Sequence, residues 1–217
     1  MNRLFGATIF GTGGYAAYSF YNSNNKKPTI FLLLGPSGVG KDTLKYGAEK
    51  ELQKNNDKSI VFCQRVITRP LKEGDIEIHE FMEKEEFLNE KEKGTFGIDW
   101  EAYNFYYGIR NDLILKPLKE GNNVILNTSR NKIKETQNKF EPKGFNVIVL
   151  EITADSEIIK NRLKLRGRET DDQIDQRIKR HLEQRKKVIE ESNKIISIEN
   201  NGTIKEGIDK FIKAVKI

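Results

Sequence analysis

A glycine-rich segment with one lysine is the part of the sequence best suited to chemistry. The segment GPSGVGKDT spans residues 35–43, between the apolar run TIFLLL and a helical pattern. Glycines let such a backbone curve so that its N–H groups hold phosphate oxygens, and the lysine adds a mobile positive charge. We therefore predict a nucleotide phosphate-binding loop (P-loop) formed by Gly35, Pro36, Ser37, Gly38, Val39, Gly40, Lys41, Asp42 and Thr43, with Lys41 catalytic.

One position departs from the usual pattern of such loops. A serine or threonine that helps to hold Mg²⁺ normally follows the lysine, whereas here Asp42 follows it and Thr43 comes next. The Asp42 carboxylate is a candidate Mg²⁺ ligand, either directly or through water, because Mg²⁺ takes oxygen ligands and keeps several waters. The alternative is that Asp42 only favours the positive end of the following helix.

Arginines near residue 165 form a second candidate site. In the segment RLKLRGRE, Arg162 and Arg166 are four residues apart on one predicted helix face, and Gly167 ends that helix. Phosphoryl transfer needs positive charge on the migrating group, and arginines on a mobile flap supply it when substrates are bound. We predict an arginine lid over about residues 162–172, with Arg166, Arg168 and Arg177 catalytic; a solvated pair of charged helices is the alternative.

These residues need a scaffold, which the alternation of strand and helix patterns predicts. Strands are expected at 29–34, 60–68, 123–127, 146–152 and 195–198, and helices at 41–54, 84–92 and 204–215. Two further helices are expected after candidate N-caps Asp155 and Asp171, the second with a buried stripe of Ile174, Ile178 and Leu182. This order predicts an α/β fold of the P-loop NTPase type: a parallel sheet with helices on both faces and ligands beyond the carboxyl ends of its strands.

An aromatic stretch at 74–107 breaks the alternation, and we interpret the region of about 70–110 as an inserted acceptor-binding lobe. The chain of 217 residues is long enough for one domain, which we place at 28–217. The single cysteine, Cys63, excludes an internal disulfide and is expected to be a buried structural thiol, and Cys63 with His79 and His181 makes no metal-ligand cluster.

The net charge of +6 suits polyanionic ligands without choosing among them. A nucleic-acid surface is disfavoured, because acids interrupt the basic run near the predicted lid: Glu169, Asp171, Asp172 and Asp175. Residues 1–27 form a leader and linker, in which 4–21 are apolar and uncharged. A membrane tether, a mitochondrial presequence and a plain leader all remain open for it, so the expected location is a cytoplasmic catalytic domain, membrane-tethered or mitochondrial in the alternatives.

Four motifs together resemble the guanylate kinase superfamily over about residues 29–215: GPSGVGKDTL, RVITRP at 65–70, a tryptophan followed by YYG at 106–108, and RGRE. Within it, the sequence is more similar to the ribose 1,5-bisphosphate phosphokinases of bacterial phosphonate utilisation. The shared features are GKD in the loop, ITR without a second arginine, the histidine at His79, VxxNxSR at 124–130, and the ending IENNGTIKEGIDKFI. Members of that family make 5-phosphoribosyl 1-diphosphate from ribose 1,5-bisphosphate and ATP.

The resemblance implies ATP and Mg²⁺ as cofactors, a small phosphorylated acceptor, and an acceptor site formed by Arg69, His79, Tyr107, Asn127 and Arg130. Where guanylate kinases have a second arginine, a tyrosine and an aspartate, this chain has Leu71 and Lys72, His79 and Asn127, so poor recognition of guanine is expected. Each residue also has a plain structural interpretation: Arg69 as an exposed strand end, Tyr107 as lobe core, His79 as a packed histidine. The segment EAYN at 101–104 differs from the bacterial pattern and leaves the acceptor open.

The resulting hypothesis is an ATP-dependent phosphotransferase that needs no general base, because the acceptor is itself a phosphate oxyanion at neutral pH. The alternatives are a guanylate kinase acting on GMP and a catalytically silent interaction module of the same fold. The presence of Lys41 disfavours the silent module.

Overall fold

The computed structural model describes residues 26–71, 77–167, 169–192 and 194–217. Its centre is a five-stranded parallel sheet in the order β2-β7-β1-β8-β9. The strands are β1 (Thr29–Leu34), β2 (Ile60–Phe62), β7 (Asn123–Asn127), β8 (Asn146–Thr153) and β9 (Ile195–Glu199). The predicted α/β class is confirmed.

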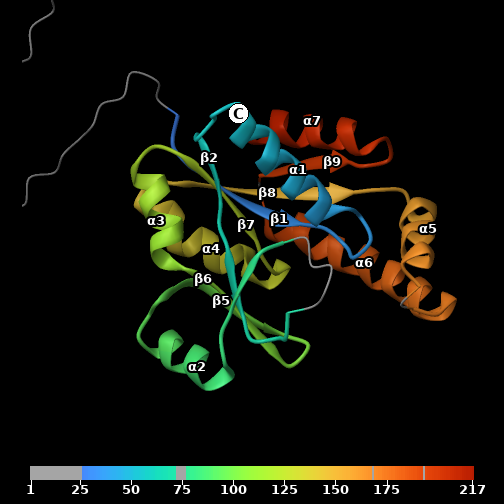
Figure 1. Cartoon of the computed structure of the whole chain (residues 1–217), viewed down its shortest axis with the longest axis horizontal. Helices are drawn as coiled ribbons and strands as arrows, with labels where there is room; N and C mark the ends of the chain where they lie inside the picture. The colour runs from blue at the N-terminus through green and yellow to red at the C-terminus, as the bar shows by residue number, and fades with distance from the viewer. Residues whose placement is uncertain (1–25, 72–76, 168, 193) are drawn as a thin grey trace, which may run out of the picture.

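Helices cover both faces of this sheet, as Figure 1 shows. Every residue of β1 is buried, and alternate side chains belong to two separate apolar clusters, as expected for a strand covered on both faces. Ile30 and Leu32 pack with α3 (Asn111–Lys119), α4 (Ile133–Phe140) and one residue of α6 (Asp171–Glu191). Phe31 and Leu33 pack with α1 (Lys41–Lys54), α5 (Ser156–Arg166) and α7 (Ile204–Val215). Single 3₁₀ turns, η1 (Arg130–Lys132) and η2 (Glu141–Lys143), flank α4.

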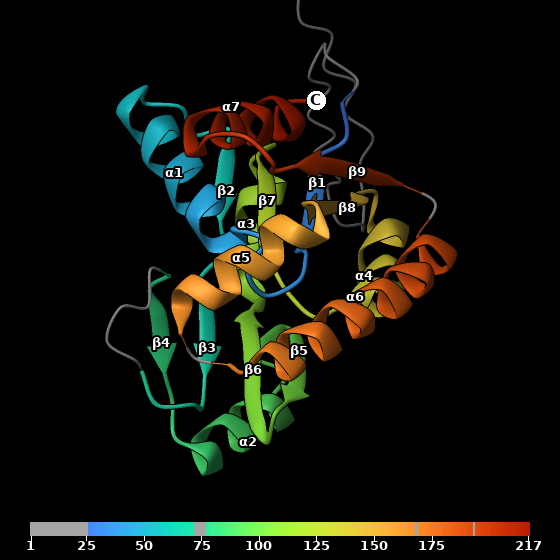
Figure 2. The same ribbon diagram turned by 90° about the vertical axis from the view of Figure 1, so that its right-hand side faces the viewer.

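A separate lobe lies below the carboxyl end of the sheet (Figure 2). Its four strands follow the order β4-β3-β6-β5 and are β3 (Arg65–Ile67), β4 (His79–Phe81), β5 (Phe96–Ala102) and β6 (Phe105–Arg110). Helix α2 (Lys84–Glu92) packs on it through Phe87, which stacks on Phe96 with ring centroids 4.4 Å apart. The lobe also contributes Ile98, Trp100 and Ile109 to the main cluster beneath β1, so lobe and sheet share one core.

The expected strand at 60–68 is wrong in one respect, because the chain changes sheets in its middle. β2 pairs with β7, whereas β3 pairs with β4 and β6 of the lobe. The buried Cys63 sits at the change: its N–H donates to the Ile125 carbonyl at 3.1 Å, continuing the pairing with β7, and its thiol contacts the Leu113 carbonyl at 3.2 Å. Burial raises the pKa of this thiol to about 12, as a structural cysteine requires.

Two expected details of α6 also need correction. Thr170, and not Asp171, is the N-cap of α6, because its side chain forms a reciprocal capping box with Gln173. Asp155 is the N-cap residue of α5, as expected, although its side chain makes no capping hydrogen bond. In the expected stripe Ile174 is buried and Ile178 partly buried, whereas Leu182 is 52% exposed because the buried face of α6 continues through His181 and Val188.

Among the described residues, no helix combines the length and apolar character needed to cross a bilayer. The predicted leader, including its tether segment 4–21, lies outside the described residues. Its role and the division at residue 27 remain predictions.

Candidate active site

The P-loop follows β1 and wraps over the start of α1. Gly38 and Gly40 have φ angles of 86° and 92°, values that side chains with a Cβ rarely adopt. A Cβ on Gly38 would lie 2.9 Å from the Leu163 side chain, and one on Gly40 would lie 2.6 Å from the amide nitrogen of Asn200. These two glycines therefore allow the loop to curve, and they allow it to pack closely against α5 and the turn after β9.

A fixed contact holds this loop in place. The Val39 carbonyl accepts hydrogen bonds from Asn200 Nδ2 at 2.8 Å and from Arg162 Nη1 at 3.2 Å, and Arg162 Nη2 donates to the Asn200 carbonyl at 3.0 Å. Arg162 thus fastens α5 to the loop. Its guanidinium is used on backbone carbonyls, so it differs in role from the other arginines of the RLKLRGRE segment.

A cavity of about 1230 Å³ opens between the loop, the carboxyl end of β7, the β5–β6 hairpin and the helices α5 and α6. It lies beyond the carboxyl ends of the parallel strands, where α/β folds bind ligands. The predicted loop residues Gly35, Pro36, Ser37 and Lys41 line it. Cations outnumber acids in its lining, which includes Lys41, Arg65, Arg130, Arg166, Arg177 and Arg180 against Glu101, Glu169 and Glu191.

Lys41 is held in an environment that disfavours its own charge. Burial lowers the pKa of its ammonium group, and the nearby guanidinium groups of Arg65 and Arg130 lower it further, against the opposing effect of Asp42 and Glu77. An anion placed beside Lys41 would relieve this repulsion. The arrangement is therefore suited to binding phosphate.

Arg130 is oriented by a residue of α6. Its Nη2 lies 3.1 Å from His181 Nδ1. Burial first, and then the charges of Arg130 and Arg185, lower the pKa of His181 to about 4, so the imidazole is neutral at physiological pH and Nδ1 can accept from Arg130. Arg185 in turn donates from Nε to Glu151 Oε1 at 3.1 Å, which fastens α6 to β8.

The predicted lid corresponds to the junction of α5 and α6. Gly167 caps α5 with a φ of 63°, as its sequence position predicts. Arg166 and Arg177 both line the cavity, and Arg177 Nη2 lies 2.8 Å from Glu169 Oε1. Arg168 lies outside the described residues.

The five predicted acceptor residues divide into two groups. Asn127 and Arg130 line the cavity, whereas Arg69, His79 and Tyr107 are not among its lining residues. His79 is buried, with Nε2 4.0 Å from Glu77 Oε2. Tyr107 stacks on Trp100, a lining residue, with centroids 5.5 Å apart, and burial raises the pKa of its phenol despite the nearby charges of Arg69 and Arg65.

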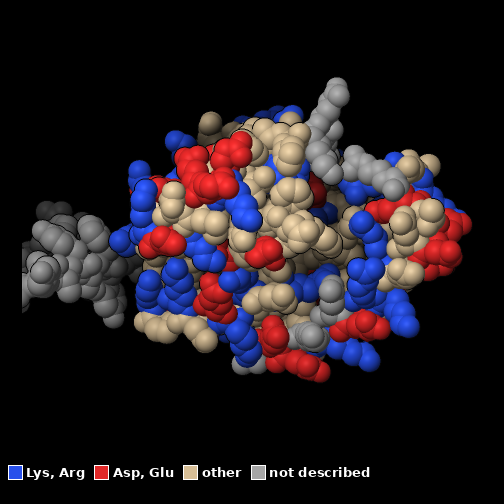
Figure 3. Space-filling view, turned by 90° about the horizontal axis from the view of Figure 1, so that it is seen from below, with Lys and Arg blue, Asp and Glu red and all other residues tan. Residues whose placement is uncertain are grey.

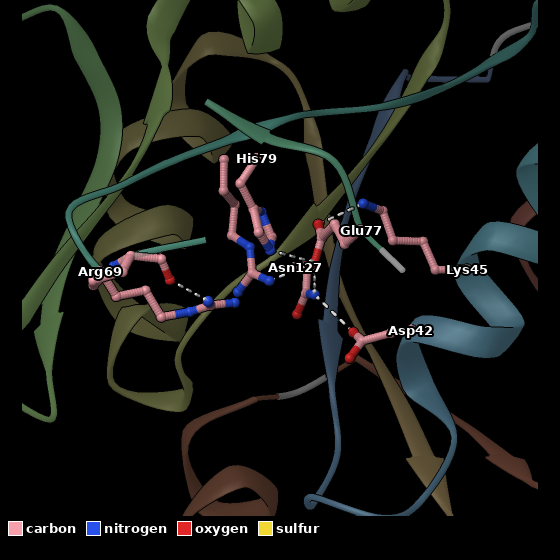
Figure 4. Close-up of polar contacts among 8 residues, drawn as sticks. Asp42, Lys45, Arg69, Glu77, His79 and Asn127 are labelled. Atoms are coloured by element: carbon pink, nitrogen blue, oxygen red, sulfur yellow. Dashed lines mark hydrogen bonds and ion pairs between the residues drawn. The ribbon is translucent and has the colours of Figure 1, made fainter. Parts of the chain in front are cut away.

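A buried carboxylate that the sequence did not single out lies at the centre of these residues (Figure 4). Glu77 contacts Lys45 Nζ at 2.6 Å, Asn127 Nδ2 at 2.8 Å and the Arg65 guanidinium. Burial alone would raise the pKa of Glu77, but Arg65 and Lys45 outweigh it and hold the value at about 2. We call Lys45, Arg65, Glu77 and Asn127 the Glu77 cluster; it joins α1, the lobe and β7.

Sequence signals for this cluster are weak. Arg65 interrupts the apolar run from Ile60 to Ile67, and Glu77 stands two residues before His79. Either feature fits an exposed strand position, and Lys45 fits an ordinary helix surface. His181 gave no signal beyond its residue type.

Asp42, the candidate metal ligand, lies next to the Glu77 cluster. Its Oδ1 accepts from Asn127 Nδ2 at 3.3 Å. In the described parts of the chain, no three His, Cys, Asp or Glu side chains gather into a metal-binding group. A metal at Asp42 would therefore need oxygen ligands from water or substrate, which is the coordination that Mg²⁺ commonly has in phosphoryl-transfer sites.

The surface charge is mixed on the face that Figure 3 shows, where lysine and arginine side chains alternate with aspartate and glutamate. Exposed ion pairs of the described residues include Lys160 with Asp175 at 2.7 Å and Lys164 with Asp171 at 2.9 Å. Positive charge is not gathered into one continuous basic area on this face.

Comparison with known proteins gives a consistent result. A family model described as guanylate kinase matches residues 26–216. The ribose 1,5-bisphosphate phosphokinase PhnN of Thiobacillus denitrificans is 37% identical over 152 residues, which cover 70% of this chain and 75% of that protein. The protein of the same name from Psychromonas ingrahamii is 38% identical over 154 residues, covering 71% and 74%.

A longer relative matches as well. The bifunctional ribose 1,5-bisphosphokinase-thymidine phosphorylase of Roseobacter denitrificans is 36% identical over 187 residues, 86% of this chain. The match covers 26% of that relative, so the chain spans about a quarter of its length. Among solved structures, guanylate kinase from Anaplasma phagocytophilum has the same fold, with a TM-score of 0.59, 19% identity, and coverage of 87% of this chain and 85% of that one.

Proposed function

The chain belongs to the guanylate kinase family, and from this premise we propose that it transfers the terminal phosphoryl group of ATP to ribose 1,5-bisphosphate, forming 5-phosphoribosyl 1-diphosphate. The observation that carries the proposal is the cavity beside the P-loop, whose lining gathers lysine and arginine side chains from the loop, the lobe and α6. The relatives named ribose 1,5-bisphosphate phosphokinase give the proposal its acceptor.

The charge of the cavity suits two highly phosphorylated substrates. ATP and a sugar bisphosphate together bring several negative charges into one enclosed space, which only a strongly cationic lining can neutralise. Lys41 and Arg130 follow the neighbouring strands β1 and β7 into this space, and Arg166 and Arg177 enter it from α5 and α6. Their distribution supports a path in which the donor lies on the P-loop and the acceptor lies towards the lobe.

The roles of the residues follow from this placement. The P-loop and Lys41 hold the donor phosphates, Arg130 and Asn127 hold the acceptor, and Arg166 and Arg177 neutralise the migrating phosphoryl group. The acceptor oxygen is already ionised at neutral pH, so the proposal assigns no general base, and positioning with charge neutralisation supplies most of the rate. Arg168 is proposed for the lid on its sequence position alone.

Mg²⁺ is proposed as the cofactor, with Asp42 as the protein group nearest to a ligand role. The cradle fits: Asp42 follows Lys41 at the start of α1, and its carboxylate oxygen faces the Asn127 amide at 3.3 Å. When bound, the ion would neutralise charge on the donor phosphates. Asn127 then positions the Asp42 side chain, because its amide donates to Asp42 and to Glu77 together.

A guanylate kinase remains the second candidate, favoured by the description of the matching family model. Recognition of guanine needs hydrogen-bond acceptors for its N–H groups, left available in a desolvated pocket. The buried carboxylate nearest to the predicted acceptor residues, Glu77, is already occupied by Lys45, Arg65 and Asn127. This occupation favours a phosphorylated sugar over a purine base.

An acceptor assay separates the two candidates. The full chain is incubated with ATP and Mg²⁺, and ADP release is measured with ribose 1,5-bisphosphate and with GMP at equal concentrations, with product identified by mass spectrometry. We expect kcat/KM for the sugar bisphosphate to exceed that for GMP by at least about a hundredfold, the discrimination typical of matched polar sites. Preferential turnover of GMP would overturn the choice of acceptor.

Calorimetric titration with a non-hydrolysable ATP analogue tests the remaining alternative, a silent interaction module. Binding is expected because the loop and Lys41 are both present. An absence of binding, together with an absence of turnover, would favour the module.

A further inference from the structure

Arg65 is a cavity residue whose surroundings the proposed function does not yet explain. It opens β3 in the lobe and lines the same cavity as Lys41. Its guanidinium lies close enough to Lys41 and Tyr107 that its positive charge acts to lower the pKa of both groups. Arg65 therefore stands between the donor loop and the part of the lobe where the acceptor is expected.

The Arg65 guanidinium forms an ion pair through one nitrogen and lacks a hydrogen-bond partner at another. One Arg65 nitrogen, Nη2, contacts Glu77 Oε2. Its Nε is buried and has no hydrogen-bond partner, although a buried donor without a partner typically costs about 1–3 kcal/mol. The hydroxyl of Thr128, another lining residue, is likewise buried without a partner. Arg65 and Thr128 thus both line the cavity, and each has one buried polar atom without a partner just behind that lining.

Glu77 fixes Arg65 without using up its donors. The carboxylate is 6% exposed and is shared among Arg65, Lys45 and Asn127, so its position is determined from three elements at once. A guanidinium has five N–H donors, and an arginine anchored through one edge presents the rest in a fixed plane. Such a plane matches the oxygens of a phosphate monoester in two-point contact.

We propose that Arg65 binds a phosphate group of the acceptor and that Glu77 is the positioning residue that holds Arg65 for this contact. The inference deepens the proposed function and rests on it, since it names the group that selects a phosphorylated acceptor. The competing explanation is purely structural: the Glu77 cluster would only tie the lobe to α1. The two roles predict different kinetics. Loss of a binding contact raises KM for the acceptor alone, whereas loss of a purely structural contact raises both KM values or neither.

The test compares Arg65→Met with a matched ion pair of the same lobe. Arg110 donates from Nε to Glu80 Oε2 at 3.1 Å and joins β6 to β4, but neither residue lines the cavity beside the P-loop. Arg110→Met therefore removes an arginine–glutamate pair of the same kind from the same sheet. KM for the acceptor, KM for ATP and kcat are measured for both variants in the full chain.

We expect Arg65→Met to raise KM for the acceptor by about 10- to 100-fold, the range for losing hydrogen bonds to a charged group. KM for ATP should stay within about threefold of wild type, because the P-loop is untouched, and Arg110→Met should change neither constant by more than about twofold. An unchanged acceptor KM in Arg65→Met, or an equal rise in both KM values, would overturn the inference.

Two further variants keep the result decisive if Arg65→Met folds poorly. Arg65→Lys keeps the charge and the pairing with Glu77 but loses the planar fork, so an acceptor KM between those of wild type and Arg65→Met is expected. Glu77→Gln keeps the size and shape of the side chain but removes its ion pair with Arg65. We expect a higher KM for the acceptor, whereas calorimetry should still detect binding of the non-hydrolysable ATP analogue. Wild-type acceptor KM in both variants would contradict the proposal.

The acceptor used is ribose 1,5-bisphosphate or GMP, whichever the wild type turns over. If the wild type uses GMP, the proposed function fails, yet the Arg65 comparison is then made with the phosphate of GMP and remains decisive. If the wild type uses the sugar bisphosphate and Arg65→Met leaves its KM unchanged, the inference fails alone.

Discussion

Replacing Lys41 by methionine should affect catalysis and stability in different directions. The substitution removes the ammonium group and keeps most of the apolar stem. In the free protein this ammonium is disfavoured by burial and by Arg65 and Arg130, which is why its pKa is lowered. Its charge therefore does not stabilise the fold, which agrees with the proposed role of Lys41 in holding the donor phosphates.

The expected magnitudes follow from this environment. Losing one preorganised donor to the migrating charge typically raises the barrier by about 3 kcal/mol, which is about a 150-fold loss in kcat. The free energy of unfolding should be unchanged or higher by up to about 1 kcal/mol, equivalent to about 2–4 °C in Tm for a chain of this size. Removal of an ordinary salt-bridged lysine would instead lower Tm.

The assay needs a control from the same helix. Lys50 also lies on α1, but its Nζ is exposed and lies over the Tyr46 ring at 4.4 Å, so Lys50→Met tests the same chemical change away from the cavity. Steady-state ADP release and thermal unfolding are measured for both variants. A kcat for Lys41→Met within about fivefold of wild type, or a clear fall in its Tm with normal activity, would refute the reasoning.

Three further outcomes are expected. Gly38→Ala should weaken binding of an ATP analogue about tenfold in calorimetry, because φ of 86° strains any Cβ and the new methyl would lie 2.9 Å from Leu163; unchanged affinity would count against the loop. Arg177→Ala should reduce kcat about 10- to 100-fold, as measured by stopped-flow kinetics. The same substitution should lower the free energy of unfolding by less than about 1 kcal/mol in thermal melting, because the ion pair of Arg177 with Glu169 is partly exposed. The lowered pKa of His181, about 4 against 6.5 unfolded, contributes stability that is present above pH 6.5 and is lost as pH falls through 4. This loss, roughly 2 kcal/mol after allowance for solvent screening, should be absent in His181→Asn when unfolding is followed from pH 7 to 4.

Elements with strong local signals were predicted from the sequence. The P-loop and α1 are marked by glycines between an apolar strand and a helical pattern, and α7 begins at a capping box of Thr203 and Glu206. These signals lie within a few residues of one another, so a single stretch of chain carries them. The fold class follows because such stretches alternate along the chain.

Helix α3 shows why other elements were not predicted. Pro117 lies within it, and proline usually indicates the end of a helix because it lacks an N–H. The carbonyl four residues earlier, that of Leu113, instead contacts the thiol of Cys63 at 3.2 Å. This partner is 50 residues away in the sequence, so no local pattern could reveal that the proline is tolerated.

The candidate site divides in the same way. Lys41 and Arg166 belong to motifs, Arg177 follows the RGRE motif by eight residues, and all three line the cavity. Glu77 takes its partners from α1, β3 and β7, and so its role depends on the tertiary arrangement alone. The leader and Arg168 lie outside the described residues, and their predicted roles stay predictions.

The core shared by the lobe and the sheet limits how the enzyme can open. Ile98, Trp100 and Ile109 are buried in the cluster beneath β1, and exposing three such side chains would cost about 5–9 kcal/mol. A hinge motion that swings the lobe outward during each turnover would have to overcome that cost. Under the proposed function, substrate entry and product release therefore fall to the side of the cavity that α5 and α6 line.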